Sequence, residues 1–211
     1  MFTGQDLVNN IGNEAAILNI FSNNIVMSTY SGAQNSGAVH LMRVVAGWGF
    51  NPYVARARDG TIIDVMSISN MPCVAGNDTF DSYWCPFVGN DCKLAWLGGG
   101  ASYMFTAKMD GCTFAMGSAA PNGNRMVAHA NLGGKGSAQL DQIKGQIAFS
   151  NDANMRYLGP SAYRFADTTG GTEATTFGLR LATGQWKFYS QVVLIDKIAK
   201  TMRLVDVMPL A

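Results

Sequence analysis

The C-terminal part of the chain, residues 177–210, constrains the fold most, because strand-forming residues fill it between two turn signals. It reads FGLRLATGQWKFYSQVVLIDKIAKTMRLVDVMPL, with a Thr-Gly turn at 183–184 and a second turn near 197–200. Val, Ile, Phe and Tyr recur in the runs between these turns, as is typical of β-strands. The tail therefore predicts two or three consecutive strands.

The same type of pattern recurs earlier in the chain. In residues 38–50 and 60–69, apolar and polar side chains alternate and β-branched residues recur, which suggests strands. The Pro and Asp-Gly signals between the two ranges indicate turns. Strand-like runs also flank the glycine triplet at 98–100, and a strand, the turn APNGN and another strand are expected within 111–132. Residues 72–92 combine turn residues with aromatics, which indicates a long irregular surface segment.

Two segments favour helices over strands. Residues 13–24 begin with an Asn cap candidate and an early Glu and then become apolar. Residues 137–148 place Leu140, Ile143 and Ile147 on one helical face behind a Ser cap. The pattern predicts an α/β fold over residues 1–211: one domain with a mixed β-sheet, sandwich-like core and helices packed outside it.

The charge and hydropathy of the chain disfavour several kinds of partner. Charged residues make up 14% of the chain, and the net charge is +1 with no basic run. This disfavours nucleic-acid binding and a basic helix on a membrane surface. The sequence shows neither a Sec-type signal nor an apolar run long enough to span a membrane. We expect a soluble, monomeric protein, secreted or delivered into a host cytosol by a route that the sequence does not show.

The cysteines and glycine-rich segments indicate no cofactor or metal. Cys73, Cys85, Cys92 and Cys112 lack the CxxC spacing of a zinc knuckle, and we interpret them as thiols. The segment NLGGKGS at 131–137 departs from a phosphate loop, because Gly rather than Ser or Thr follows its lysine. No carboxylate pair stands out as a glycosidase acid and base.

Cys112 and His129 are the residues that could carry chemistry. A cysteine hydrolase needs a thiolate, a nearby base, and backbone N–H groups where the oxyanion forms. Gly111 before Cys112 lets backbone approach a substrate, and His129 follows in MVAHAN, on a strand that could lie beside the cysteine. The residues alone leave a second interpretation open, in which Cys112 is an inert buried thiol and His129 a core histidine.

A resemblance to a known family bears on this choice. The run MFTAKMDGCTFAMGS at 104–118 and the later MVAHAN at 126–131 resemble the deamidase toxins typified by Burkholderia lethal factor 1 and the catalytic domain of cytotoxic necrotizing factor. The shared positions are Phe105-Thr106, Gly111-Cys112, Phe114-Ala115, Gly117, Val127 and His129. A helix after the histidine is also shared, and a second, weaker sequence similarity lies at 182–189.

The resemblance implies a function and a role for each matched residue. It implies a protein glutamine deamidase, a bacterial toxin or effector that acts on a host protein presenting a glutamine side chain. Cys112 would be the nucleophile, His129 the base and then the acid, and Thr106 the residue that orients the histidine. The sequence departs from the toxins at Asp110, where they have serine. A carboxylate there could raise the pKa of the thiol, point away from it, or orient His129.

Two alternatives stay open. An amine could intercept the thioester, giving a transglutaminase, or the enzyme could act on another amide. The chain could instead be a non-catalytic, protein-binding domain with a coincidental motif.

Overall fold

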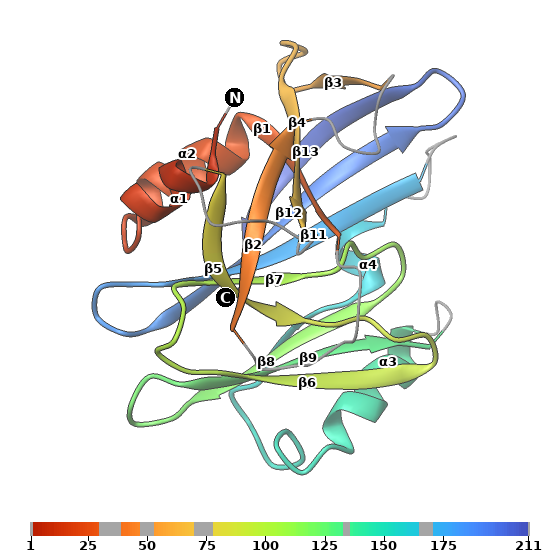
Figure 1. Ribbon diagram of the computed structural model, residues 1–211. Coiled ribbons are helices and arrows are strands. Elements are labelled where there is room, and N and C mark those ends of the chain that lie inside the picture. Colours follow the sequence, from red (N-terminus) through yellow and green to blue (C-terminus); the bar gives the residue numbers. More distant parts are fainter. Residues whose placement is uncertain are drawn as a thin grey trace.

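Nine strands form the larger of two sheets, and their spatial order differs from their order in the chain (Figure 1). The computed structural model describes residues 2–29, 39–46, 53–69, 78–132, 136–164 and 171–210. In spatial order the strands are β1 (Asn24–Thr29), β4 (Asp64–Ser69), β2 (Val39–Ala46), β5 (Thr79–Cys85), β7 (Tyr103–Thr106), β11 (Gly171–Arg180), β12 (Trp186–Asp196), β13 (Thr201–Pro209) and β3 (Val54–Arg56). The β1–β4, β5–β7 and β13–β3 pairs are parallel and the others antiparallel, so the sheet is mixed.

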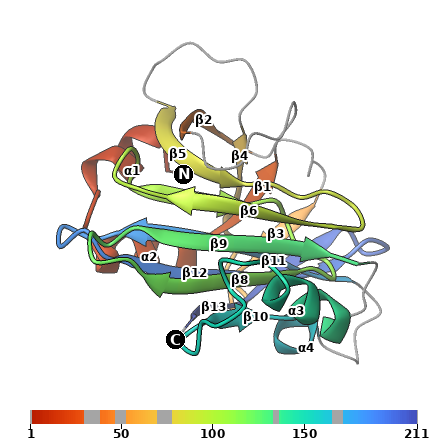
Figure 2. The ribbon, with the colours of Figure 1, turned by 90° about the horizontal axis from the view of Figure 1, so that it is seen from below.

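The second sheet is smaller and antiparallel throughout. Its spatial order is β10 (Arg156–Leu158), β8 (Thr113–Ala119), β9 (Arg125–Asn131) and β6 (Asp91–Leu97). Figure 2 shows β8 and β9 side by side, with helices α3 (Gly136–Lys144) and α4 (Pro160–Tyr163) at one end of the pair. A core of buried residues, including Met104, Phe114, Val127 and Phe188, fills the space between the two sheets.

Helices cover the outer faces of this arrangement. Helices α1 (Gly4–Asn9) and α2 (Glu14–Ser22) pack Leu7, Ile17 and Phe21 against the larger sheet. On the far side of the smaller sheet, Ile143 of α3 and the nearby Phe149 pack against small residues of β8 and β9. The result is two sheets with a shared core and helices outside, as the sequence predicts.

The larger sheet curls until its first strand approaches its last ones, so that it nearly closes into a barrel. Gln191 of β12 is fully buried and links this late strand to the segment where α2 ends and β1 begins. Its Nε2 donates to the carbonyl oxygens of Phe21 (2.6 Å) and Asn24 (2.7 Å), and its Oε1 accepts from the N–H of Val26 (2.7 Å). One side chain therefore satisfies three backbone groups between the end of α2 and the start of β1.

Most predicted elements are confirmed in the described residues. Helix α2 begins where the sequence indicates, and the side chain of Asn13 accepts from the N–H of Ala16 at 3.1 Å. The tail forms three strands, β11 to β13, and the turn before β12 uses Gly184 at φ +83°. Strands β2 and β4 lie within the predicted ranges 38–50 and 60–69.

Three predictions are wrong in part. Residues 79–85, expected to be irregular surface, form strand β5, whose Trp84 and Cys85 are fully buried; residues 72–77 lie outside the described residues. Strand β3 occupies part of the predicted turn region 51–60, where the turn itself ends at Gly60. Helix α3 ends at Lys144, so Ile147 is 97% exposed instead of joining the buried face with Ile143.

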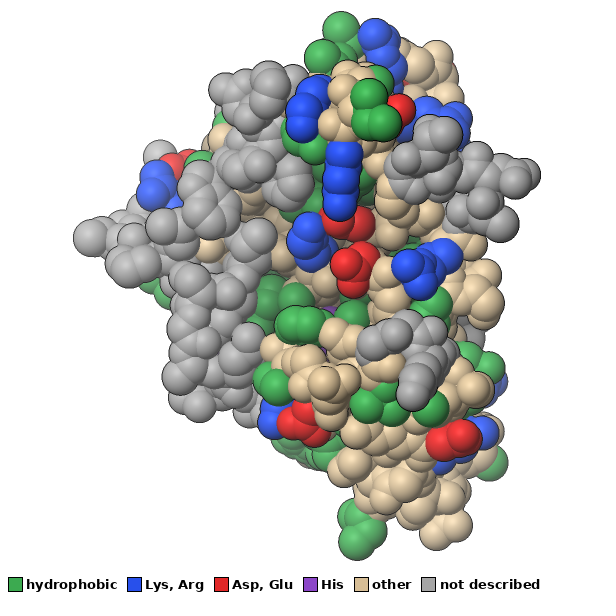
Figure 3. Space-filling view, turned by 90° about the vertical axis from the view of Figure 1, so that its right-hand side faces the viewer, with side chains coloured by type: hydrophobic (Ala, Val, Ile, Leu, Met, Phe, Trp, Pro, Cys, Tyr) green, Lys and Arg blue, Asp and Glu red, His purple; other side chains and the backbone are tan. Residues whose placement is uncertain are grey.

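Charged side chains of both signs are mixed on one face of the molecule. On the face drawn in Figure 3, basic side chains lie among acidic and hydrophobic ones rather than in a continuous basic area. Across the described ranges, every helix is too short or too polar to cross a membrane.

Candidate active site

The pairing of β8 with β9 sets the positions of Cys112 and His129. Phe114 of β8 lies opposite His129 of β9. Cys112 lies just before β8, two residues from Phe114, and both side chains belong to the core between the sheets. The structure thus places Cys112 and His129 at the same end of the β8–β9 pair, and no hydrogen bond joins them.

Cys112 is buried in the core between the sheets, with an exposed fraction of 1%. Burial raises the pKa of its thiol to about 12, and the negative charge of Asp110 adds to this effect. The backbone N–H groups of Asp110 and Gly111 act in the opposite direction, because they stabilise the thiolate. In this conformation Cys112 is therefore a neutral thiol near pH 7.

His129 is also buried, with an exposed fraction of 1%. Burial lowers the pKa of its imidazole to about 4, partly offset by the backbone carbonyls of Cys85 and Pro86. These carbonyls lie nearby without hydrogen-bond geometry, since neither ring nitrogen forms a hydrogen bond with a described residue. The ring of Phe87 lies 6.0 Å from the imidazole, centre to centre. His129 is thus a neutral imidazole whose nitrogens have no hydrogen-bond partner among the described residues.

Thr106 reaches the same interior layer from the larger sheet. It pairs with Cys85 on β5 and shares the face of that cysteine, which belongs to the core around Cys112. Its hydroxyl accepts from the N–H of Thr176 at 3.3 Å and donates to the Thr176 carbonyl at 3.4 Å. These bonds tie Thr106 to β11, and no described contact joins it to His129.

Asp110, which differs from the serine of the resembling toxins, has an exposed side chain. Its charge raises the pKa of Cys112, which corresponds to the first of the three roles considered for it. The neighbouring Met109 is held on β11 by two backbone hydrogen bonds with Ala174, of 2.7 and 2.8 Å. This bridge fixes the direction in which the chain passes through Asp110 to the cysteine.

Two residues that the sequence prediction missed hold the backbone at Cys112. Gln139 of α3 donates from Nε2 to the Gly111 carbonyl at 2.7 Å, and the hydroxyl of Tyr163 in α4 donates to the Cys112 carbonyl at 2.8 Å. Both side chains are fully buried. A signal existed for Gln139, because it lies four residues before Ile143 on the face predicted to be apolar. Nothing local in the sequence points to Tyr163.

These two hydrogen bonds also orient the peptide groups around Cys112. In a trans peptide the N–H points away from the carbonyl of the same unit. With the Gly111 carbonyl held by Gln139, the N–H of Cys112 points the opposite way. Such a fixed N–H is what an oxyanion site requires.

No metal site accompanies this arrangement within the described ranges, where no group of three His, Cys, Asp or Glu side chains gathers. Cys85, Cys92 and Cys112 are free and buried, and Cys73 lies outside the described residues. Burial also raises the pKa of the Cys85 and Cys92 thiols. Of the three, Cys85 has its carbonyl near His129, and Cys112 lies two residues before the strand partner of that histidine.

Comparisons with known proteins assign no family. No protein-family model matches the chain, and a comparison with curated proteins found no match.

Proposed function

We propose that the chain is a cysteine-dependent protein glutamine deamidase, in which Cys112 is the nucleophile and His129 the base. The observation that carries the proposal is the β8–β9 register, which sets Phe114, two residues after Cys112, opposite His129. The order of Thr106, Cys112 and His129, similar to that in the deamidase toxins, supports the same assignment.

The proposed reaction begins from a neutral thiol and a neutral imidazole, whose pKa values of about 12 and about 4 must approach each other before a proton can pass between them. Because both groups are neutral in this conformation, the imidazole of His129 takes the thiol proton as the sulfur attacks the amide carbon. The C–N bond then breaks, and His129 returns the proton to the departing nitrogen, so that ammonia leaves. Water hydrolyses the thioester, which yields glutamate and regenerates the thiol.

The burial of Cys112 requires a structural change for this reaction. At 1% exposure the sulfur cannot contact a glutamine side chain, so side chains that cover it must move when a substrate binds. Gln139 and Tyr163 keep the backbone of residues 111 and 112 in place during such a movement. Thr106 contributes to the scaffold through β11 in this conformation and is proposed to orient the histidine when the site opens.

The test is peptide mapping of eukaryotic cell extract incubated with the protein in ¹⁸O-labelled water. A glutamine converted to glutamate gains about three daltons, because the amide nitrogen is replaced by labelled oxygen. We expect this product with the wild-type chain and with Cys92→Ser, whose buried thiol packs on the opposite face of the smaller sheet. Cys112→Ser and His129→Ala should give none.

Other products would change the assignment. Amine adducts on glutamine would indicate a transglutaminase, and cleaved chains a peptidase. Full activity of Cys112→Ser would refute the proposed nucleophile.

A protein-binding domain without catalysis is the second candidate function. The full burial of both residues and the raised pKa of Cys112 favour it, because an inert packed cysteine has these properties. Absence of any Cys112-dependent product in the labelled-water experiment would support this candidate.

A further inference from the structure

A groove of about 850 Å³ opens at a junction of the two sheets, and neither Cys112, His129 nor Thr106 lines it. Its walls come from α2, the turn-side ends of β8 and β9, residues 154–156, the start of β12 and the end of β13. This volume lies within the range that binding sites usually have, roughly 300–1,000 Å³.

The floor of the groove is apolar and aromatic. Met116, Trp186 and Phe188 line it and also belong to the core between the sheets. The rings of Trp186 and Phe188 are stacked, with centroids 6.2 Å apart. These three side chains are only 2–6% exposed, so the floor is preformed, and the apolar surface open to a ligand comes from Val207, Pro209 and Leu210 beside them.

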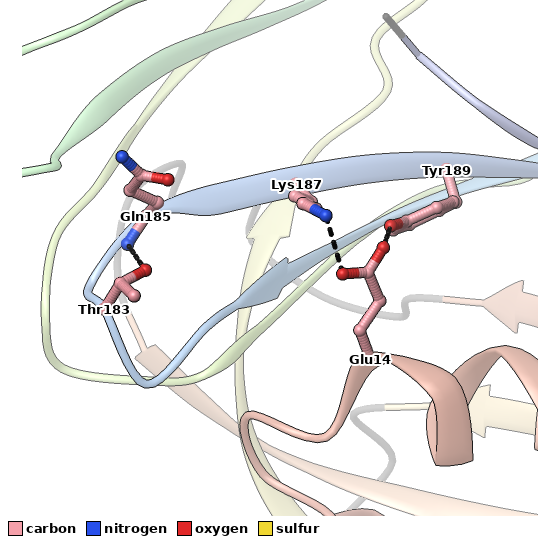
Figure 4. Close-up of polar contacts among 5 residues, drawn as sticks. All are labelled: Glu14, Thr183, Gln185, Lys187 and Tyr189. Carbon is pink, nitrogen blue, oxygen red and sulfur yellow. Dashed lines mark hydrogen bonds and ion pairs between the residues drawn. The ribbon is translucent and has the colours of Figure 1, made fainter.

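The acidic groups at the groove already have their hydrogen-bond donors. Figure 4 shows Glu14 of α2 pointing between Lys187 and Tyr189 of β12, and both donate to its carboxylate. The hydrogen bond from Lys187, followed by that from Tyr189, lowers the pKa of Glu14. Asp152, beside the groove, accepts from the backbone and hydroxyl of Ser118 and from the N–H of Asn154. Little acceptor capacity remains on either carboxylate.

The arginines at the groove, in contrast, have N–H groups without an acceptor among the described residues. Within the described ranges, Arg156 donates only to the carbonyls of Asn154 and Met155, at 3.3 and 3.4 Å. Arg125 donates to the Gly117 carbonyl at 3.1 Å, and its buried Nε has no partner among the same residues. In the described part of the chain no carboxylate forms an ion pair with either arginine. Burial lowers the pKa of Arg125, only partly offset by Asp152, so a bound anion would stabilise its charge.

We propose that this groove binds an acidic peptide segment of a partner protein, in which an apolar side chain lies next to Asp or Glu. The apolar side chain packs beside Trp186 against Val207, Pro209 and Leu210, while the carboxylate pairs with Arg156 and Arg125. Aromatic residues, Met and Arg are the types enriched at protein interfaces, and Trp and Arg dominate their binding energy. This combination favours a peptide segment over a small anion. The proposal does not rest on the reaction assigned to Cys112.

The test is an NMR titration of the full-length protein, followed at the indole N–H of Trp186, assigned with Trp186→Phe. The probes are acetyl-Leu-Asp-Phe-Asp-Leu-amide and its isosteric Asn counterpart, which carries no charge. We expect the Asp peptide to shift the Trp186 signal and to bind about tenfold more tightly than the Asn peptide, from its paired charges. Arg156→Glu should remove this preference.

The control variant is Arg203→Glu, an exposed arginine on β13 that does not line the groove. It changes the net charge equally and should leave the affinity of the Asp peptide unchanged. Equal binding of the two peptides, no Trp186 shift with either one, or an equal loss in Arg203→Glu would overturn the proposal. Competition by inorganic phosphate at the affinity of the Asp peptide would show a small-anion site instead.

Discussion

At the scale of single residues, Cys112 should be a slowly reacting thiol in the folded protein. With its pKa raised to about 12, only about one molecule in 10⁴ carries the thiolate at pH 8. Alkylation of the folded protein by iodoacetamide should therefore rise about tenfold per pH unit between pH 7 and 10, without a plateau. Peptide mapping after timed quenching measures the rate at this residue alone.

Asp110→Asn provides a matched comparison for that measurement. Asp110 is exposed and its charge raises the pKa of Cys112, so its removal should increase the alkylation rate a few-fold at each pH while the fold is kept. A rate unchanged by Asp110→Asn would mean that the carboxylate does not act on the sulfur. A plateau near pH 8 would mean that the thiol has an ordinary pKa.

His129 should make the stability of the protein depend on pH. Its folded-state pKa of about 4 lies below the ordinary value of about 6.5, so the unfolded chain binds more protons between these values. The contribution of His129 to the free energy of unfolding is full above about pH 6.5 and is lost as the pH falls towards 4. Urea unfolding should show a loss of roughly 3 kcal/mol over this window.

The variant His129→Gln should abolish this part of the pH dependence, because glutamine does not titrate. Replacing His40, which lies half-buried on β2, should leave the contribution of His129 intact. An identical dependence in wild type and His129→Gln would show that the pKa of His129 is the same in the folded and unfolded states.

At the scale of elements, helices α3 and α4 should act on the candidate site through Gln139 and Tyr163. Tyr163→Phe leaves the buried carbonyl of Cys112 without its donor, which should cost about 1–2 kcal/mol. Gln139→Met should cost less, because it also removes a buried amide oxygen that has no partner. Chemical denaturation measures both costs, and a greater loss for Gln139→Met would contradict this order.

Elements that carry their own sequence signals could be predicted, and strand β5, which lacks such signals, could not. Helix α2 and the strands of the tail were predictable because each carries its own cap, alternation or turn residues. Strand β5 was not, because both of its faces are buried, so that it shows no polar alternation, and turn residues flank it. Its last residue and the following Pro86 supply the carbonyls near His129, so this part of the site remained hidden as well.

At the scale of the whole molecule, Gln191 should stabilise the curled sheet. Gln191→Leu keeps a side chain of similar size but leaves three buried backbone groups unsatisfied, which should cost about 3 kcal/mol or more. Gln185→Leu, one residue before β12 and exposed, is the control and should change stability little. Urea midpoints measure both, and a near-neutral Gln191→Leu would mean that the closure does not depend on this bridge.

The closure of the sheet could not be predicted from the sequence. A buried glutamine between strand residues looks like any polar residue on an exposed face, and its partners lie 165 to 170 positions away in the chain. The general class was predictable, because strand patterns dominate and two helices carry clear signals. The strand order, which sets β5 parallel to β7 beside the core of Cys112, depends on pairings between distant segments.

The β8–β9 hairpin has a consequence for how proteins with such a site can diverge. Cys112 and His129 stand at its open end, while its turn at residues 120–124 and the irregular pairing after Met116 lie at the other end. Insertions at the turn therefore lengthen the sequence between the two residues without moving either one. Only the pairing at the open end must be preserved. A motif defined by a fixed number of intervening residues would miss relatives that differ in this way, whereas a search that leaves the length of the hairpin free would find them.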